Sequence, residues 1–416
     1  MKKLLWIGHS GTLQTGFGRV AQNILHYAHQ SWDVAVLGIG YDGDPHTMPY
    51  KIYPAGNRGD QWGMNRLEHV YFGHKPDVTC IVMEPWNIAE YVKNLRAGLG
   101  SKPKIVAYAV IDGENVKAEH AHWLSQCDVC IFPTDFAVAE AKKAGYHGYG
   151  YVIPHGVNPV LYRPCNKQWA RKQIGLSNLL DEDAFIFNNV NMNQPRKRID
   201  LSIEAFALFL ERAGNPPQCM LNLHLSKKME EGWDIGQLAT YFDVRGRISV
   251  IAEEIKTVEE NMKYVYNAAD VQITTTAGEG FGLTTLEGMA CGIAQIVPDF
   301  SALGDWAKPA CVAVPVSDRQ IMSKQQNVVR RTPTASDVAD AMVAIYQDAE
   351  MRKRLGRMAR KYSLQETFRW STIASGFEEA FIRALDGPGV SGTILAQAEA
   401  NTGTGPSGTP LAISQQ

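Results

Sequence analysis

The stretch Asp270–Trp306 reads DVQITTTAGEGFGLTTLEGMACGIAQIVPDFSALGDW, and it decides the fold of this chain. Residues 271–276 are mostly β-branched, which favours a strand. Alternate glycines from Gly278 to Gly282 indicate a loop, and a helix that opens at Thr284 is expected to lead into a second strand. A glycine-rich loop that runs into a helix presents unpaired backbone N–H groups and the positive end of the helix dipole. The stretch therefore predicts a site for an anion, most often a phosphate.

Two carboxylates, Glu279 and Glu287, flank this loop. Thr284-Thr-Leu-Glu287 fits the capping box Ser/Thr-x-x-Glu, so the local pattern favours Glu287 as a helix cap. A solvated charge remains an alternative for Glu279, and the glycines are also consistent with plain turn residues. Because these features coincide in one strand–loop–helix unit, a functional site is the better interpretation.

Composition places the chain among ordinary globular proteins. It has 416 residues, 45% hydrophobic and 20% charged, with a formal net charge of −2. A charge so close to zero gives no global attraction for nucleic acid. No run of about 18 apolar residues occurs, so we expect no transmembrane helix. Seven cysteines, an odd number with scattered spacing, are typical of a reducing cytoplasm, and we predict a cytoplasmic protein.

Apolar runs alternate with segments of helical periodicity along most of the chain. The expected strands are 3–8, 33–39, 77–83, 104–111, 128–132, 149–153, 185–190, 220–225, 248–251, 271–276, 296–297 and 313–315. The expected helices are 19–28, 62–72, 89–96, 118–125, 136–144, 199–212, 235–242, 258–268, 284–291, 338–349, 351–362 and 366–385. This alternation predicts parallel sheets with helices on both faces.

The fold class predicted is therefore α/β, with two doubly wound, Rossmann-like domains that face each other across a cleft. The N-terminal domain is expected at 1–155, a linker at 156–183 and the C-terminal domain at 184–362. Residues 363–386 are expected to form a terminal helix that packs back on the N-terminal domain. Residues 387–416, rich in Gly, Ser, Thr, Ala and Pro, are predicted to be a disordered tail.

The central stretch also resembles a known family. Glu279-Gly-Phe-Gly-Leu-Thr-Thr-Leu-Glu287 is similar to the E-x7-E motif of retaining GT-B glycosyltransferases of the family 4 type. Pro154-His-Gly-Val-Asn158 resembles the interdomain linker of that family, and Asn193–Asp200 resembles its phosphate-binding segment. The resemblance covers residues 1–385 and implies the GT-B fold.

The resemblance implies roles for residues around the loop. Glu279 would contact the donor sugar, and Glu287 would bind the ribose of a nucleotide-sugar donor such as a UDP- or GDP-sugar. Lys197 would neutralise the diphosphate, since a cation at a helix start otherwise opposes the dipole. The remaining donor-binding residues would be Arg196, the backbone around Gly282, Leu283 and Thr284, and the loop at Gly16. The family usually needs no metal or cofactor, so the resemblance implies none here.

The N-terminal half departs from the family pattern. Family members often place a His near the reacting centre where this chain has Asp112, which is predicted either to orient the acceptor hydroxyl or to cap a turn. The usual Arg before Lys197 is missing, and Arg196 is expected to replace it. Three further residues are predicted on the acceptor side: Glu84, Trp86 and His155.

Other functions remain open at this level. The acceptor is expected to be a glycan, a lipid-linked sugar or a small metabolite. The basic run Arg352–Lys361 is also consistent with hydroxymethylated bases of viral DNA as acceptor, or with peripheral contact to anionic lipid, although a solvated helix face is favoured. Gly16-x-Gly18-x-x-Ala21 resembles a dinucleotide fingerprint and would fit an NAD(P)-dependent oxidoreductase. A non-catalytic sugar-nucleotide-binding protein is the last alternative.

Overall fold

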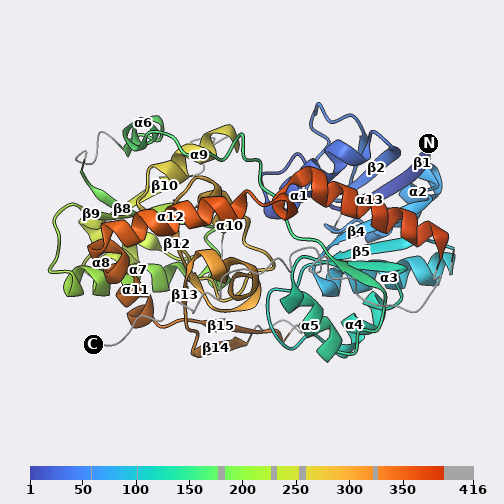
Figure 1. The fold of residues 1–416 in the computed structure, drawn as a ribbon. Coiled ribbons are helices and arrows are strands. Elements are labelled where there is room, and N and C mark those ends of the chain that lie inside the picture. The colour runs from blue at the N-terminus through green and yellow to red at the C-terminus, as the bar shows by residue number, and fades with distance from the viewer. Residues whose placement is uncertain are drawn as a thin grey trace, which may run out of the picture.

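The computed structural model describes the chain in seven segments: residues 1–57, 59–100, 102–176, 183–225, 232–252, 259–321 and 327–387. The predicted tail therefore lies outside the described residues, apart from Gly387. Two lobes lie side by side in Figure 1, each built on its own sheet.

The first sheet has seven parallel strands in the order β3-β2-β1-β4-β5-β6-β7. Its strands are β1 (Lys2–His9), β2 (Trp32–Ile39), β3 (Lys51–Pro54), β4 (Val78–Met83), β5 (Ile105–Ala109), β6 (Val129–Phe132) and β7 (Gly150–Val152). Successive side chains of a strand point to opposite faces. Leu4 and Trp6 of β1 accordingly enter one core, whereas Leu5 and Ile7 enter the other. Burial on both faces explains why β1 reads as an unbroken apolar run.

Helices cover both faces of this sheet. They are α1 (Gly16–Ala28), α2 (Met64–His74), α3 (Pro85–Leu99), α4 (Ala118–Leu124), α5 (Asp135–Lys143) and α13 (Trp370–Asp386). α1 and α13 share one face, and the other four helices cover the opposite face. The Thr15 side chain accepts a hydrogen bond from the backbone N–H of Gly18, and this N-cap fixes where α1 begins.

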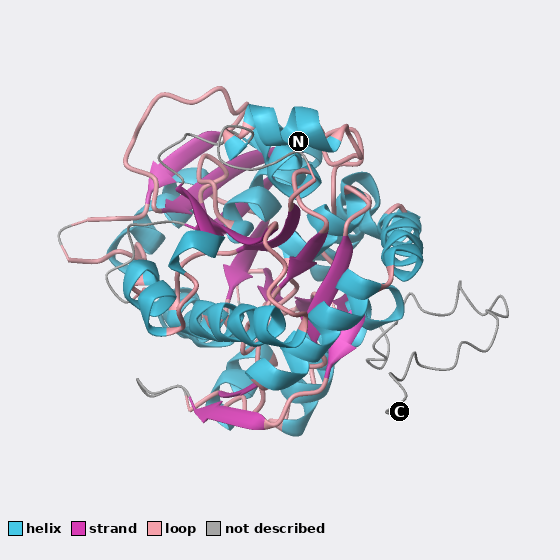
Figure 2. Cartoon of the chain, turned by 90° about the vertical axis from the view of Figure 1, so that its left-hand side faces the viewer, coloured by secondary structure: helices cyan, strands magenta, loops and turns pink. Residues whose placement is uncertain are grey.

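The second sheet has six parallel strands in the order β10-β9-β8-β11-β12-β13. Its strands are β8 (Phe185–Val190), β9 (Cys219–Leu225), β10 (Ile248–Ala252), β11 (Val271–Ile273), β12 (Ala294–Pro298) and β13 (Val312–Val314). Its helices are α6 (Lys167–Gln173), α7 (Ile199–Arg212), α8 (Ile235–Tyr241), α9 (Glu259–Asn267), α10 (Leu283–Ala290), α11 (Ala335–Gln347) and α12 (Ala349–Ser363). Figure 2 shows helices (cyan) on either side of the strands (magenta). The prediction of two doubly wound α/β sheets is confirmed.

The chain crosses between the lobes twice, and the two crossings lie side by side. Val157 of the first crossing donates a backbone hydrogen bond to the Phe368 carbonyl of the second, at 2.9 Å. α13 then lies over the lobe that holds β1, β4 and β5 (red in Figure 1). Its apolar residues, among them Phe377 and Phe381, join the core of the first sheet.

Several elements differ from the expectation. The last helix does not run from 366 to 385, because a 3₁₀ turn Glu366–Phe368 and an extended Arg369 precede α13. The range expected to be a linker, 156–183, contains α6, which packs against α9. β3 was not expected, nor was the antiparallel hairpin of β14 (Asp318–Ile321) and β15 (Val329–Thr332). β14 is polar and largely exposed, so it carries no apolar run for a sequence pattern to detect.

Candidate active site

The two sheets share one topology, and it predicts where a ligand binds. Strand order reverses between β1 and β4 in the first sheet and between β8 and β11 in the second. Ligands of doubly wound sheets bind beyond the carboxyl ends of the strands at such switch points. A cavity of about 820 Å³ lies there. Its lining includes residues that follow three of these strands, namely Glu84 after β4, Asn191 after β8 and Glu279 after β11, together with His9, the last residue of β1.

Most of the predicted site residues meet in this cavity. It is lined by Gly16, Glu84, His155, Arg196, Lys197, Glu279, Gly282, Leu283 and Thr284. Trp86, Asp112 and Glu287 are not among its lining residues in the described part of the chain. Residues that sequence reasoning did not select also line it, notably His9, Arg19, Val110 and His224.

Lys197 and Glu279 form a buried ion pair in the wall of the cavity. Lys197 ends a 3₁₀ turn, Pro195–Lys197, just before α7. Arg196 joins the pair from one side, with its Nη1 atom 3.3 Å from Glu279 Oε2 and 3.0 Å from the Gly278 carbonyl oxygen. One carboxylate thus faces two cations, and the local charge favours an anionic ligand.

Burial and neighbouring charge shift the pKa values of this pair. Burial raises the pKa of the Glu279 carboxyl, but Lys197 and Arg196 together outweigh it and lower the pKa to about 2. Burial and the adjacent Arg196 guanidinium lower the pKa of Lys197 to about 8, despite the attraction of Glu279. At neutral pH both groups are charged, and a second anion beside Lys197 would further favour its charged form.

The loop before α10 is held against the N-terminal lobe by two glycines. A Cβ at Gly278 would lie 2.0 Å from the Asp112 carbonyl oxygen, and a Cβ at Gly280 would lie 2.0 Å from Val110 Cγ1. Real Cβ atoms essentially never come so close, so only glycine allows this approach. The Glu279 backbone N–H also donates to Ser301 Oγ at 3.0 Å. Ser301 belongs to the same lobe as Glu279, whereas Gly278 and Gly280 bring the two lobes into direct contact on either side of Glu279.

Helix N-termini also converge on the cavity. Gly16 begins α1, and Leu283 begins α10 after Gly282, which adopts a left-handed conformation with φ of 94°. Gly282 occupies the N-cap position of α10 and has no side chain with which to cap it. The capping-box interpretation is therefore wrong, because Thr284 lies inside the first turn instead of at the N-cap. Two helix dipoles and Lys197 together make the centre of the cavity suited to phosphate groups.

Glu287 lies behind the cavity wall and already has two partners. Arg19 of α1 forms an ion pair with Glu287 Oε1, and Tyr266 donates to Oε2 at 2.5 Å. The Arg19 contact joins the lobes across 268 positions of sequence. Arg19 lies one turn inside a helix N-terminus, where a cation opposes the dipole. That local mismatch was the available sequence signal that Arg19 has an acidic partner elsewhere.

Asp112 is placed differently from the expectation. β5 ends at Ala109, and the Asp112 carboxylate pairs with Arg330 of β15 at 2.8 Å. Val110 of the same segment faces the cavity instead. Since β14–β15 was not expected, its arginine could not be foreseen as the partner of Asp112. The Asp112 carboxylate therefore joins the lobes, and Asp112 is not among the described residues that line the cavity.

Two residues predicted on the acceptor side, Glu84 and Trp86, lie at the N-terminus of α3. Glu84 occupies the N-cap position and lines the cavity, and burial raises the pKa of its carboxyl. It accepts a hydrogen bond from Asn87 at 3.3 Å. Trp86 lies in the first turn of α3 and is not among the described residues that line the cavity.

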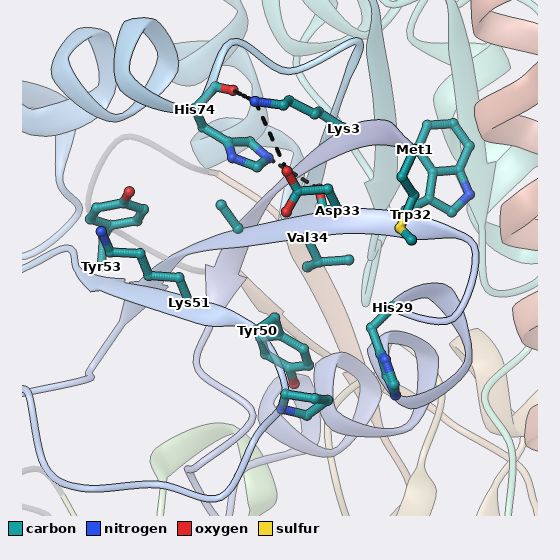
Figure 3. Close-up of a pocket in the computed structure, with 12 residues that line it drawn as sticks. Met1, Lys3, His29, Trp32, Asp33, Val34, Tyr50, Lys51, Tyr53 and His74 are labelled. Carbon is teal, nitrogen blue, oxygen red and sulfur yellow. Dashed lines mark hydrogen bonds and ion pairs between the residues drawn. The ribbon is translucent and has the colours of Figure 1, made fainter.

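A second hollow, of about 700 Å³, lies in the N-terminal lobe (Figure 3). It is lined by the first residues of strands, among them Trp32 and Lys51, and thus lies at the amino ends of the sheet. Its Lys3 ammonium already donates to the His74 carbonyl at 3.2 Å and lies 3.9 Å from an Asp33 carboxylate oxygen. This hollow is at the edge opposite to that used by ligands of such sheets.

Comparison with known proteins adds to this geometry. The family model described as "Family 4 Glycosyltransferase in conflict systems" matches residues 170–377, which is half of the chain. The chain belongs to this family. Its E-x7-E segment and Lys197 both lie within the matched range. Among the described residues of this family 4 member, no group of His, Cys, Asp and Glu side chains could hold a metal ion.

The family 4 chain has similar but distant curated relatives. It is 26% identical over 238 residues to a D-inositol 3-phosphate glycosyltransferase of Nocardia farcinica, covering 56% of this chain and 47% of that protein. It is 25% identical over 303 residues to the enzyme of the same name from Geodermatophilus obscurus, covering 71% of this chain and 59% of that protein. The chain thus spans about half the length of the curated relatives it matches.

Solved structures confirm the GT-B fold of this family 4 member. Sucrose-phosphate synthase from Thermosynechococcus elongatus superposes with a TM-score of 0.74 at 18% identity, covering 93% of this chain and 100% of that one. Anabaena HepE in complex with UDP and glucose superposes with a TM-score of 0.69 at 15% sequence identity, covering 92% of this chain and 100% of that one.

Two arginines of the basic helix α12 (Ala349–Ser363) make contacts within the protein. Arg352 donates to the Ile345 carbonyl at 2.9 Å and lies over the Phe185 ring, and Arg360 donates to the Ala290 carbonyl at 2.5 Å. These arginines satisfy the last carbonyls of α11 and α10. The described helices include none that is both long and apolar enough to cross a membrane.

Proposed function

We propose that this chain transfers a sugar from a nucleotide-sugar donor to an acceptor hydroxyl, with retention of the anomeric configuration. The observation that carries the proposal is the buried cluster of Lys197, Arg196 and Glu279 at the switch point of the second sheet. Membership of family 4 supports it. The E-x7-E resemblance supports retention.

The leaving group of such a donor is a nucleoside diphosphate, whose charge grows as the glycosidic bond breaks. Lys197, Arg196 and the N-termini of α1 and α10 face the place where that charge would develop. Fixed cations and dipoles in a cavity that excludes water stabilise such charge without reorganisation. In our proposal the diphosphate draws Lys197 partly away from Glu279, which frees the carboxylate to bind hydroxyls of the transferred sugar.

The contact between the lobes supports the same reaction. Hydrolysis competes with transfer whenever water reaches the reacting carbon. The close approach of Gly278 and Gly280 to the 110–112 segment brings the two lobes together beside Glu279. We propose that this closed arrangement excludes water during transfer.

We propose a UDP-sugar as the donor and a small hydroxyl compound as the acceptor. The donor assignment is supported by relatives of the same fold whose structures hold UDP, glucose or UDP-glucose. The curated relatives are named for an inositol 3-phosphate acceptor, which supports a small acceptor here. DNA as acceptor is not favoured, because Arg352 and Arg360 are engaged within the protein.

The test is a transfer assay on the purified chain. UDP-, GDP-, ADP- and TDP-sugars are screened by thermal shift, since a bound ligand stabilises the folded state. The stabilising donor is then incubated with a panel of sugars and cyclitols, and the anomeric configuration of the product is read by NMR. Glu279→Gln and Lys197→Ala are expected to lower kcat/KM at least about 100-fold. Rates within a few-fold of the parent, or an inverted product, would contradict the proposal.

A further inference from the structure

Two buried histidines line the active-site cavity without hydrogen-bond partners in the described structure. His155, which follows β7, is 6% exposed, and both of its ring nitrogens lack a partner. His224, in β9, is 7% exposed, and its Nδ1 atom lacks one. Both residues belong to the cavity lining. Most buried polar side chains in proteins have a partner, so each exception requires an explanation.

An unpaired buried imidazole destabilises the folded chain, because it gives up its hydrogen bonds to water and receives none in return. An apolar side chain at either position would cost less folding free energy. Residues that break a packing rule in this way concentrate at functional sites. A ligand in the cavity would supply the missing partners, and this is the simplest physical reason for both histidines.

His155 lies at the junction of the two lobes. Its ring packs 5.6 Å from the Tyr108 ring of β5 and 4.8 Å from the Phe281 ring, measured between ring centroids. Phe281 follows Glu279 by two positions and stacks on Trp306 at 4.7 Å. These aromatic contacts hold the imidazole in place beside the Glu279 end of the cavity.

His224 lies on a different wall, in β9 beside the end of β8. It is opposite Val190 in the parallel register, and its carbonyl accepts a hydrogen bond from the Asn191 backbone at 3.2 Å. Burial lowers the pKa of His224, and the nearby Arg19 guanidinium lowers it further. Arg19 in turn contacts Glu287, so His224 lies toward the Glu287 end of the cavity.

Both rings are neutral near pH 7. Burial lowers the pKa of His155 to about 3, and burial together with Arg19 lowers the pKa of His224 to about 4. A neutral imidazole has one N–H donor and one acceptor nitrogen. That pair matches an uncharged hydroxyl or amide group better than a phosphate, which accepts hydrogen bonds and offers no donor when fully ionised. Lys197 and Arg196 provide the cations for the phosphates.

We infer that His155 binds a hydroxyl of the transferred sugar and that His224 binds the nucleoside part of the donor. The inference rests on the proposed function and assigns the two ends of the donor to the two ends of the cavity. The diphosphate would lie between them, beside Lys197. Binding would satisfy imidazole nitrogens that the ligand-free chain leaves unpaired.

The experiment measures binding of UDP and of UDP-sugar to the full chain by titration calorimetry. His155→Leu is expected to raise the Kd of UDP-sugar about 5- to 100-fold, because a buried polar group of the ligand loses its partner. The Kd of UDP should stay within about twofold of the parent value. His224→Leu is expected to raise the Kd of UDP and the Kd of UDP-sugar by equal factors. His155→Gln and His224→Gln keep a donor and an acceptor and should recover part of the affinity.

A second measurement separates a ligand contact from a structural role. Without ligand, both Leu variants are expected to melt at or above the temperature of the parent, because an unpaired polar group has been removed. A lower melting temperature together with unchanged affinities would show that the imidazoles serve packing and would overturn the inference. Weaker binding of UDP alone by His155→Leu would overturn the assignment of the two ends.

Failure of the inference is distinguishable from failure of the proposed function. If the parent chain binds no sugar nucleotide of any base, the proposed function itself is wrong. If the parent binds one and transfers its sugar while all four histidine variants bind it equally well, only the inference fails.

Discussion

Replacing Gly280 by alanine tests whether lobe contact is needed for transfer. The added methyl group would meet Val110 Cγ1 at 2.0 Å, whereas the Val110 Cβ atom would be 3.5 Å away. The clash therefore comes from a γ-methyl group of one side chain. Val110→Ala removes that group and leaves an ordinary van der Waals contact.

The magnitude follows from the cost of overpacking. Forcing one extra methyl group into a packed contact typically costs about 1 to 3 kcal/mol. If the lobes separate to relieve the clash, the closed arrangement loses that free energy. A loss of 1.4 kcal/mol is a factor of ten, so kcat/KM should fall by about 5- to 150-fold.

A double-mutant cycle on kcat/KM provides the assay. Gly280→Ala alone should show the full loss, and Val110→Ala alone a small one, because Val110 is only partly buried. The double variant should recover most of the activity, which gives a coupling free energy of about 1 to 3 kcal/mol. Far-UV circular dichroism and melting curves of each variant check that the fold is kept.

Gly278→Ala is the matched control. Its added methyl group would meet the Asp112 carbonyl oxygen, which belongs to the backbone and cannot be trimmed. Val110→Ala should therefore not rescue it. The reasoning is refuted if Gly280→Ala keeps the activity of the parent, or if Val110→Ala rescues both glycine variants equally.

The other predictions concern charge. The depressed pKa of Glu279 gives stability that is present above pH 4.5 and is lost as pH falls toward about 2. Glu279→Gln should remove this acid-sensitive stability, which amounts to at most about 3 kcal/mol. Melting curves recorded between pH 5 and 2 measure the difference. Asp112→Ala leaves the buried Arg330 guanidinium unpaired and should lower the free energy of unfolding by about 3 to 5 kcal/mol in a denaturant titration. Asp112→Ala combined with Arg330→Met should recover this stability. Arg360→Ala should cost about 1 kcal/mol and exposed Arg357→Ala almost nothing, and neither should change migration of duplex DNA in a gel shift.

Local patterns were sufficient where an element is stabilised by its own lobe. Phe185–Val190 and Ile199–Arg212 have the bounds expected from an apolar run and a helical repeat. The E-x7-E stretch correctly predicted a strand, a loop and a helix that face a cavity. In each case the signal lies within about 15 consecutive residues, which is the range over which periodicity operates.

Contacts between the lobes were not predictable in this way. The arginine partner of Glu287 lies 268 positions away, and the arginine partner of Asp112 lies 218 positions away. The capping-box pattern gave the wrong role for Glu287 because a short motif cannot reveal a distant arginine. β15 was missed because it is held by the other lobe, through the bridge between Glu114 and Val329 and the contact of Arg331 with Glu114.

The return of α13 to the first sheet has a consequence for synthesis. Proteins are made from the N-terminus, and domains usually fold as they emerge. Here one face of the first sheet is covered by α1 alone until Trp370–Asp386 has left the ribosome, since Trp370, Phe377 and Phe381 complete its core. The second sheet, although made later, needs no residue beyond Phe368 for its own cores. The half of the protein that is translated first is thus the last that can finish folding, and a nascent chain stalled before residue 370 would present an apolar sheet face to chaperones.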